Sequence, residues 1–170
     1  ELPYGKQREK RGGMWYTPTS GIWQTVWMEA VPAAHIESIR VDSTLTGATL
    51  TVTGGEAQKT LILHTEGGDH TYEFKGDAFT LTPNEIHLWT PDDPYLYHFT
   101  LTSGADTVHS YFALRTVGIG EGKNGPVICL NDKPTLFHGL LDQGYFSDGI
   151  YLPASPEGYR YDIQTMKSLG

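Results

Sequence analysis

Residues 95–102, with the sequence YLYHFTLT, indicate the fold class of this chain. Apolar and polar side chains alternate along the whole stretch. One face would carry the apolar members, which are Tyr95, Tyr97, Phe99 and Leu101. Because successive side chains leave opposite faces of a pleated strand, this alternation predicts a half-buried antiparallel strand.

The same alternation continues outward in both directions. It recurs in residues 25–31, 35–42, 48–55, 61–66, 70–75, 78–83 and 108–115. Turn signals separate these stretches, at Gly47, Gly54-Gly55, Gly67-Gly68, Gly76 and Gly104. About seven to eight short strands within about 90 residues predict a mainly β chain whose core is an immunoglobulin-like antiparallel β-sandwich.

The stretch that follows the sandwich is rich in glycine. Residues 116–125 read TVGIGEGKNG, but a phosphate-binding loop would need a helix after it, and the apolar strand PVICL follows instead. We therefore expect a linker or a hairpin here. Residues 126–142 then predict two strands around the tight-turn pair Asn131-Asp132.

The last segment predicts a single amphipathic helix. Ser155 suits the N-cap, Pro156 suits the first helical position, and Gly170 suits the C-terminal cap. Tyr159, Ile163 and Met166 recur at helical spacing and would form one apolar face. Such a face must pack on something, because a lone helix of this length is only marginally stable in water.

Composition excludes some classes of function. The formal net charge of −8 argues against nucleic acid as the main partner, because phosphate binding needs a basic surface. The single cysteine, Cys129, cannot form an internal disulfide, which leaves the compartment open. No apolar run approaches the roughly 20 residues that span a bilayer. The chain has no signal peptide, but it starts without Met, so we expect that a preceding segment has been removed.

Few residues offer chemistry on their own. Asp92 and Asp93 are adjacent but lie in the rigid turn PDDP, and no carboxylate pair can be assigned to the hydrolysis of a sugar bond. His64 and His70 could face each other across a hairpin and bind a metal; the alternative is that both are ordinary polar strand residues. We assign no metal site and expect no cofactor. The aromatic residues, 12% of the chain, could stack on sugar rings or fill the core.

Five stretches together resemble glycoside hydrolase family 2, which includes β-galactosidases, β-glucuronidases and β-mannosidases. They are GGMWYTPTSGIWQTVWMEAVP, LWTPDDPYLYHFTL, SYFALRTVGI, LNDKPTLFHGLLDQGYFSDGIY and SPEGYRYDIQTMKSLG, which come in the family's order and cover essentially the whole chain. The resemblance implies a domain map. Residues 1–22 would be the tail of an N-terminal jelly-roll domain, residues 23–116 the sandwich, and residues 117–170 the hairpin, first strand, first loop and first helix of an incomplete (β/α)8 barrel.

The resemblance also implies an activity. The parent enzyme would be a retaining glycosidase of β-galactosidase type that acts on a β-linked saccharide. The sandwich would contact the rest of its own chain, and the enzyme would form a homo-oligomer. Bacterial periplasmic or secreted localisation is implied as well. The family's acid/base glutamate follows an asparagine in the barrel, whereas the only Asn-Glu pair here, Asn84-Glu85, lies in the sandwich. We therefore expect this chain alone to be inactive.

Three residues are candidates for substrate contact in the parent enzyme. If residues 135–142 are the first barrel strand, Asp142, Gln143 and Tyr145 follow the strand end at which barrel active sites lie. A carboxylate and an amide suit sugar hydroxyl groups, and an aromatic ring suits a sugar face. The alternative is that Asp142 and Gln143 only brace the loop.

Two other classes of function compete with the enzyme part. The chain would then be a non-catalytic carbohydrate-binding module that uses exposed aromatic side chains, or a protein-binding adhesion domain. Residues 126–170 discriminate between them, because a free-standing sandwich has no use for an added hairpin and helix.

Overall fold

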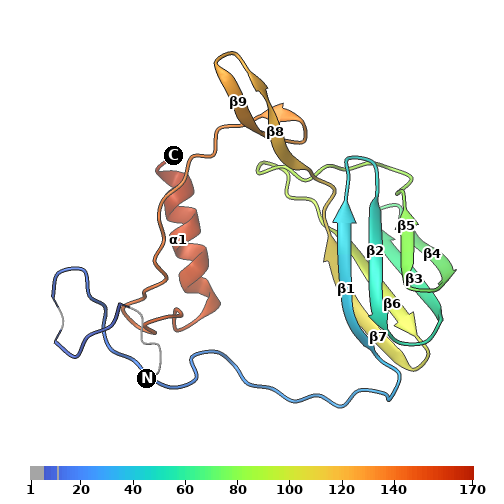
Figure 1. The fold of residues 1–170 in the computed structure, drawn as a ribbon, viewed down its shortest axis with the longest axis horizontal. Coiled ribbons are helices and arrows are strands. Elements are labelled where there is room, and N and C mark those ends of the chain that lie inside the picture. Colours follow the sequence, from blue (N-terminus) through green and yellow to red (C-terminus); the bar gives the residue numbers. More distant parts are fainter. Residues whose placement is uncertain (1–5, 11) are drawn as a thin grey trace. The chain divides into compact units, whose positions relative to one another are not determined.

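The computed structural model describes residues 6–10 and 12–170. They form two compact units (Figure 1). One unit joins the described part of residues 1–28 to residues 139–170, and the other comprises residues 29–138.

The unit of residues 29–138 contains a seven-stranded antiparallel sandwich. One sheet has the order β1-β2-β5 and the other the order β4-β3-β6-β7. The bounds are β1 (Ile36–Ser43), β2 (Ala48–Gly54), β3 (Gln58–Thr65), β4 (Gly68–Lys75), β5 (Ala78–Leu81), β6 (Tyr97–Ser103) and β7 (Asp106–Phe112). The predicted mainly β fold and its immunoglobulin-like sandwich are confirmed.

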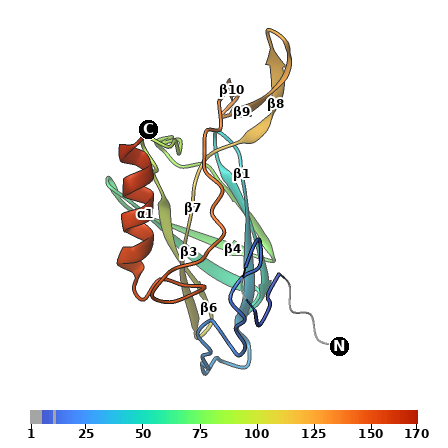
Figure 2. The ribbon, with the colours of Figure 1, turned by 90° about the vertical axis from the view of Figure 1, so that its left-hand side faces the viewer.

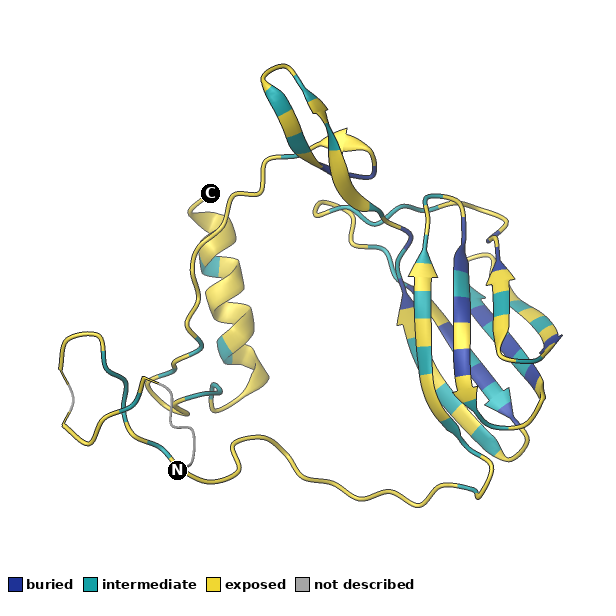
Figure 3. Ribbon diagram, in the orientation of Figure 1, coloured by how far each residue is buried: buried dark blue, intermediate teal, exposed yellow. Residues whose placement is uncertain are grey.

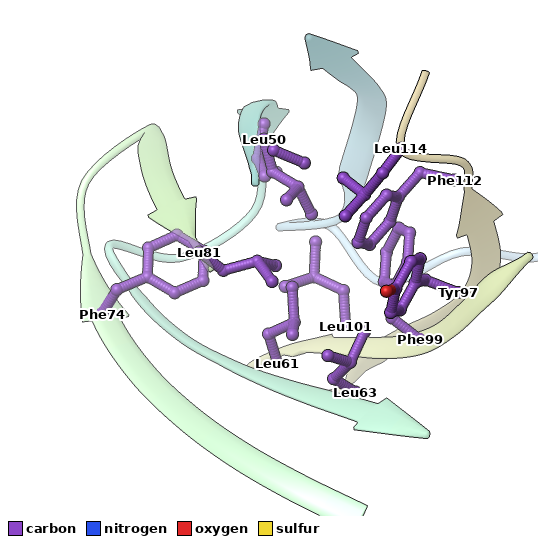
Figure 4. Packing of buried hydrophobic residues seen from close by; sticks show 12 residues of the cluster. Leu50, Leu61, Leu63, Phe74, Leu81, Tyr97, Phe99, Leu101, Phe112 and Leu114 are labelled. Carbon is purple, nitrogen blue, oxygen red and sulfur yellow. The ribbon is translucent and has the colours of Figure 1, made fainter. Parts of the chain in front are cut away.

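The apolar faces of the two sheets meet in a single core (Figure 4). Leu50 and Val52 come from β2, and Tyr97, Phe99 and Leu101 come from β6; each exposes at most 1% of its surface. Alternate residues of β6 lie on the outer face, as the alternation of YLYHFTLT predicts.

One charged side chain lies in this unit with almost no solvent exposure. Lys59 on β3 is only 1% exposed. Its Nζ donates hydrogen bonds to the carbonyl oxygens of Glu56, at 2.8 Å, and Gly76, at 3.0 Å. The Asp77 carboxylate lies 3.9 Å from the same Nζ. These partners offset the cost of burying an ammonium group, which is large for an unpaired charge.

A hairpin follows the sandwich, as predicted for the glycine-rich stretch. It consists of β8 (Val117–Gly122), β9 (Gly125–Leu130) and the two-residue strand β10 (Lys133–Pro134), which lies beside β9 in Figure 2. A Cβ atom at Gly120 would lie 2.7 Å from the Cys129 sulfur, so the glycine lets a side chain of β9 lie across β8. Strand packing therefore explains the glycine at position 120.

The turn between β9 and β10 has the predicted residues. Asn131 and Asp132 have φ values of 51° and 61°, the left-handed pair that a type I′ turn requires. The Asn131 side chain also accepts a hydrogen bond from the Thr116 backbone N–H and donates one to the Trp89 carbonyl. This asparagine therefore fixes both the turn and the base of the hairpin.

Two predicted strands are wrong. Residues 25–31 form no strand, and Met28 is 97% exposed. Beyond Pro134, residues 135–142 are not strand either, although the Thr135 N–H still donates to the Ile128 carbonyl. Alternation of side chains describes an extended backbone, but a strand also needs a paired neighbour, and neither segment has one among the described residues.

The helix α1 (Pro156–Ser168) has nearly the predicted limits. Ser155 occupies the N-cap position, but its hydroxyl makes no capping bond to the backbone and instead binds Glu157, which lowers the pKa of that carboxyl. No residue of the helix is buried, and Figure 3 shows it exposed along nearly its whole length. None of the described helical segments combines the length and apolar character that a bilayer crossing requires.

Candidate functional site

A row of four aromatic rings joins the two segments of the unit made by residues 6–28 and 139–170. Tyr16 stacks on Tyr145 with ring centroids 4.4 Å apart, and Tyr145 lies 5.2 Å from Tyr151. Tyr151 in turn meets the edge of Trp23 at 5.8 Å. The outer members come from the N-terminal segment and the inner two from the loop before α1, so the row holds these segments together.

Local backbone bonds place the two inner tyrosines side by side. The N–H of Phe146 donates to the Ile150 carbonyl at 2.7 Å, and the N–H of Ile150 donates to the Phe146 carbonyl at 3.0 Å. Ile150 adopts a positive φ of 67°, which closes this short loop. Tyr145 and Tyr151 therefore flank the closed loop from either end.

The hydroxyl of Tyr151 is the polar centre of the row. It accepts a hydrogen bond from Gln7 Nε2 at 2.5 Å and pairs with Thr19 Oγ1 at 2.6 Å. Gln7 Oε1 also accepts from the Thr19 backbone N–H at 2.9 Å. Gln7, Thr19 and Tyr151 thus form a closed polar network next to the aromatic rings.

Two grooves flank the row, and their lining is chemically similar. A groove of about 620 Å³ is lined by residues that include Lys6, Trp15, Tyr16, Gln143 and Tyr145. A second groove of about 630 Å³ is lined by Gln7, Thr19, Ser20, Gly21, Ile22, Trp23 and residues 149–153. Both linings contain aromatic rings, an amide and hydroxyls, and the second adds the aliphatic side chains of Ile22, Ile150 and Leu152. Among the described residues, neither lining contains a carboxylate.

The three predicted contact residues lie at or near the first groove. Gln143 and Tyr145 line it, in contact with the N-terminal segment. Asp142 Oδ1 accepts a hydrogen bond from the Gly144 backbone N–H at 2.7 Å, which is a turn within the loop itself. The structure therefore brings Gln143 and Tyr145 to one groove and gives Asp142 a bracing contact.

The electrostatics of the first groove are set by cations and phenols. Lys6 is the only charged residue of its lining in the described part of the chain, and the Arg8 guanidinium lies 3.9 Å from the centre of the Trp15 ring. Loss of hydration raises the pKa of Tyr145 above its ordinary value of 10, and the hydrogen bond with Tyr151 adds to this effect. The Tyr145 hydroxyl is therefore a neutral hydrogen-bonding group at physiological pH.

The histidines of the sandwich do not form the metal pair that the sequence left open. The register places His64 opposite Asp69 and Leu63 opposite His70, so the two histidines lie on opposite faces of the sheet. His64 Nδ1 lies 2.9 Å from Asp69 Oδ1, and its Nε2 lies 2.8 Å from Thr100 Oγ1. Across the described residues, no group of three or more His, Cys, Asp or Glu side chains is suited to a metal ion.

The sequence analysis missed three members of the site. Gln7, Thr19 and Tyr151 form the polar network. Tyr151 is more than 130 residues away from both Gln7 and Thr19 in the chain. Only the aromatic content of the N-terminal segment and of the loop pointed toward this site. The pairing of these distant segments carries no periodic or spacing signal.

The arrangement is suited to binding a hydroxylated ring. Aromatic faces and edges can pack on a sugar, while amides and phenols exchange hydrogen bonds with its hydroxyl groups. Hydrolysis of a glycosidic bond would also need two carboxyl groups about 5–9 Å apart, and the lining residues that the structure describes include no carboxylate.

Comparisons with known proteins identify a family that the sandwich resembles. Residues 34–115 match the profile of the family described as Glycosyl hydrolases family 2. The matched stretch contains all seven strands of the sandwich, so the sandwich is similar to a domain of that family.

Individual relatives match over most of this chain. The β-galactosidase large subunit of Leuconostoc lactis is 29% identical over 171 residues, which cover 86% of this chain and 26% of that protein. The Faecalibacterium prausnitzii β-glucuronidase structure has a TM-score of 0.68 at 24% identity, over 80% of this chain and 23% of that one. A Ruminococcus gnavus β-glucuronidase structure has a TM-score of 0.64 at 21% identity, over 81% and 24%.

The two structures share the fold with this chain. All three matches cover most of this chain but only a small part of the other protein. This chain spans about a quarter of the length of each of these proteins.

Proposed function

We propose that this chain acts as part of a retaining family 2 glycosidase that hydrolyses a β-linked saccharide. The observation that carries the proposal is the groove beside the aromatic row, in a chain whose sandwich matches the family. Gln143 and Tyr145 present an amide and a phenol there, next to Tyr16 and Trp15. Substrate of β-galactoside type is favoured by the Leuconostoc lactis relative.

The proposed division of labour follows the domain map implied by the resemblance. Residues 1–22 would close a jelly-roll domain, residues 23–116 would act as a structural sandwich, and residues 117–170 would begin the catalytic barrel. The catalytic glutamates would lie in barrel residues outside this chain. The aromatic row supports this division, because it ties the N-terminal segment to the loop before α1, as a link between two domains would.

Asp142 has two candidate roles, which are to brace the loop and to bind a sugar hydroxyl. Its hydrogen bond with the Gly144 N–H fits a residue that only braces the loop. A carboxylate has further lone pairs, however, and can accept hydrogen bonds from sugar hydroxyls at the same time. In the complete enzyme, we expect Asp142 to do both.

Two substitutions separate these readings. Asp142→Asn keeps an oxygen for the Gly144 N–H but removes the charge, so kcat/KM on an aryl β-galactoside should fall roughly tenfold if a sugar hydroxyl binds there. Asp142→Ala should lower kcat/KM by at least the same factor. Asp148→Ala is the matched control, because Asp148 also accepts a backbone N–H within this loop, from Ala154.

The same assays decide the outcome. Unchanged kcat/KM for Asp142→Asn would mean that Asp142 is a brace and would remove it from the proposed site. The aryl β-glucuronide, run in parallel with the β-galactoside, tests the substrate class.

A further inference from the structure

The sandwich contains a cavity of its own that the proposed function does not use. It has a volume of about 230 Å³ and lies between the β3–β4 turn and the segment before β6. Its lining residues are Thr65, Glu66, Gly67, His70, Pro83, Asn84, Glu85, His87, Tyr95 and Tyr97. All of them belong to the unit of residues 29–138, so the cavity is complete within one compact unit.

A buried hydroxyl fixes one wall of the cavity. Tyr97 is only 1% exposed, and its hydroxyl accepts a hydrogen bond from the His87 N–H at 2.7 Å. The same hydroxyl donates to the Glu85 carbonyl at 3.0 Å. The backbone that carries the Glu85 and His87 side chains is therefore held by the core of the sandwich.

The side chains of this wall are also held in place. The His87 ring lies flat on Tyr95, with centroids 4.0 Å apart and planes 6° apart. His87 Nε2 lies 2.6 Å from Asp93 Oδ2, which fixes the orientation of the ring. A wall held in this way loses little freedom when a ligand binds, and such preorganisation favours binding.

Other polar groups at the cavity have no partner within the described residues. The carboxylates of Glu66 and Glu85 form no ion pair or side-chain hydrogen bond there, and neither does the His70 imidazole or the Asn84 amide. Loss of hydration raises the pKa of Tyr95 above its usual value of 10, and the negative charges of Glu66 and Glu85 add to this effect. Donors and acceptors therefore converge on one small volume.

Charge selects among small ligands. The unit of residues 29–138 carries 14 Asp and Glu residues against 6 Lys and Arg, so the whole formal net charge of −8 lies in it. None of the lining residues of the cavity is a lysine or arginine. An anionic ligand would meet two carboxylates without a fixed cation, whereas a neutral polyol would find acceptors for its hydroxyl groups and donors for its oxygens.

We propose that this cavity is an accessory binding site for one pyranose ring of a neutral saccharide, separate from the grooves beside the aromatic row. Glu66 and Glu85 accept hydrogen bonds from ring hydroxyls, and the Tyr95 hydroxyl and His70 donate to ring oxygens. The volume is below the range usual for drug-sized ligands and suits one sugar ring. The site is a property of the sandwich, so it holds whether or not the proposed glycosidase activity is correct.

The test is a titration of the isotope-labelled 170-residue chain with D-galactose, followed by backbone amide NMR shifts. We expect saturable shifts that map to residues 65–70 and 84–87. D-Galacturonate, which has the same ring with a carboxylate, should give no saturable shifts at equal concentration. Glu85→Gln should weaken galactose binding roughly tenfold, because a hydrogen bond to a charged acceptor is lost.

Glu73→Gln provides the matched control. Glu73 lies on β4 with an exposed side chain, outside the cavity lining, and its substitution removes the same charge from the same unit. Galactose affinity should be unchanged by it. No saturable shift with galactose, equal binding of galacturonate, shifts that map away from the cavity, or equal losses for the two variants would each overturn the proposal.

Discussion

At the scale of single residues, the sandwich depends on polar groups placed where the core gives them partners. Lys59 extends from β3 with 1% exposure, and its ammonium group binds two backbone carbonyls that close the ends of neighbouring turns. The alternation of β3 places this lysine on the same face as Leu61 and Leu63. Its burial follows from the register of β3 with β4, which places Lys59 opposite Phe74 on the core side.

Replacing Lys59 by methionine should lower the free energy of unfolding by about 2–4 kcal/mol. The methionine fills a similar volume, but the Gly76 carbonyl loses the lysine as a donor, and the Glu56 carbonyl keeps only the Ser103 hydroxyl, at 3.3 Å. Urea unfolding of the 170-residue chain measures the change. Lys75→Met on the exposed end of β4 is the control and should stay within about 0.5 kcal/mol of the unsubstituted chain. A Lys59→Met protein as stable as the control would contradict this account of the lysine.

At the scale of elements, local sequence patterns correctly predicted those strands and turns that depend on neighbouring residues in the chain. The alternation around residues 95–102 correctly predicted β6, and Asn131-Asp132 correctly predicted a tight turn. The same alternation failed in residues 25–31, because pairing depends on a neighbouring strand that the sequence of the segment does not reveal. Tyr151, Gln7 and Thr19 were missed for a related reason. Their network arises from two segments far apart in the chain.

The hairpin turn gives a prediction at this scale. Asn131→Ala should destabilise the β8–β9–β10 hairpin by about 1–3 kcal/mol, because alanine disfavours the left-handed backbone and removes the bonds to Thr116 and Trp89. Hydrogen exchange of the β9 amides reports this local opening. Asn124→Ala, in the turn between β8 and β9, is the control and should leave exchange at β9 nearly unchanged. Equal exchange rates in the two variants would argue against the role of Asn131.

At the scale of the whole molecule, charge and titration are unevenly distributed. All seven histidines and the entire formal net charge of −8 fall in residues 29–138. Burial raises the pKa of Tyr97 above its ordinary value of 10. The unfolded chain therefore releases this proton at a lower pH than the folded chain does.

This difference predicts an alkaline loss of stability. Below pH 10 the contribution of Tyr97 is fully present, and it declines as the pH rises from about 10 through the folded pKa, by up to about 1.4 kcal/mol per pH unit for one proton. Urea unfolding at pH 8, 9, 10 and 11 measures the slope. Tyr97→Phe should show a smaller slope and a loss of about 1–3 kcal/mol at pH 8, where its hydrogen bonds to residues 85 and 87 are missing. Identical slopes for the two proteins would rule out Tyr97 as the source.

The central claim is that these residues bind and position a saccharide within a family 2 glycosidase but do not cleave it. The most direct measurement compares the 170-residue chain with a longer polypeptide that completes the barrel begun by residues 117–170, on an aryl β-galactoside, with the anomer of the first product followed by NMR. We predict turnover with retention for the longer polypeptide and none for the 170-residue chain. Turnover by the 170-residue chain alone would contradict the account.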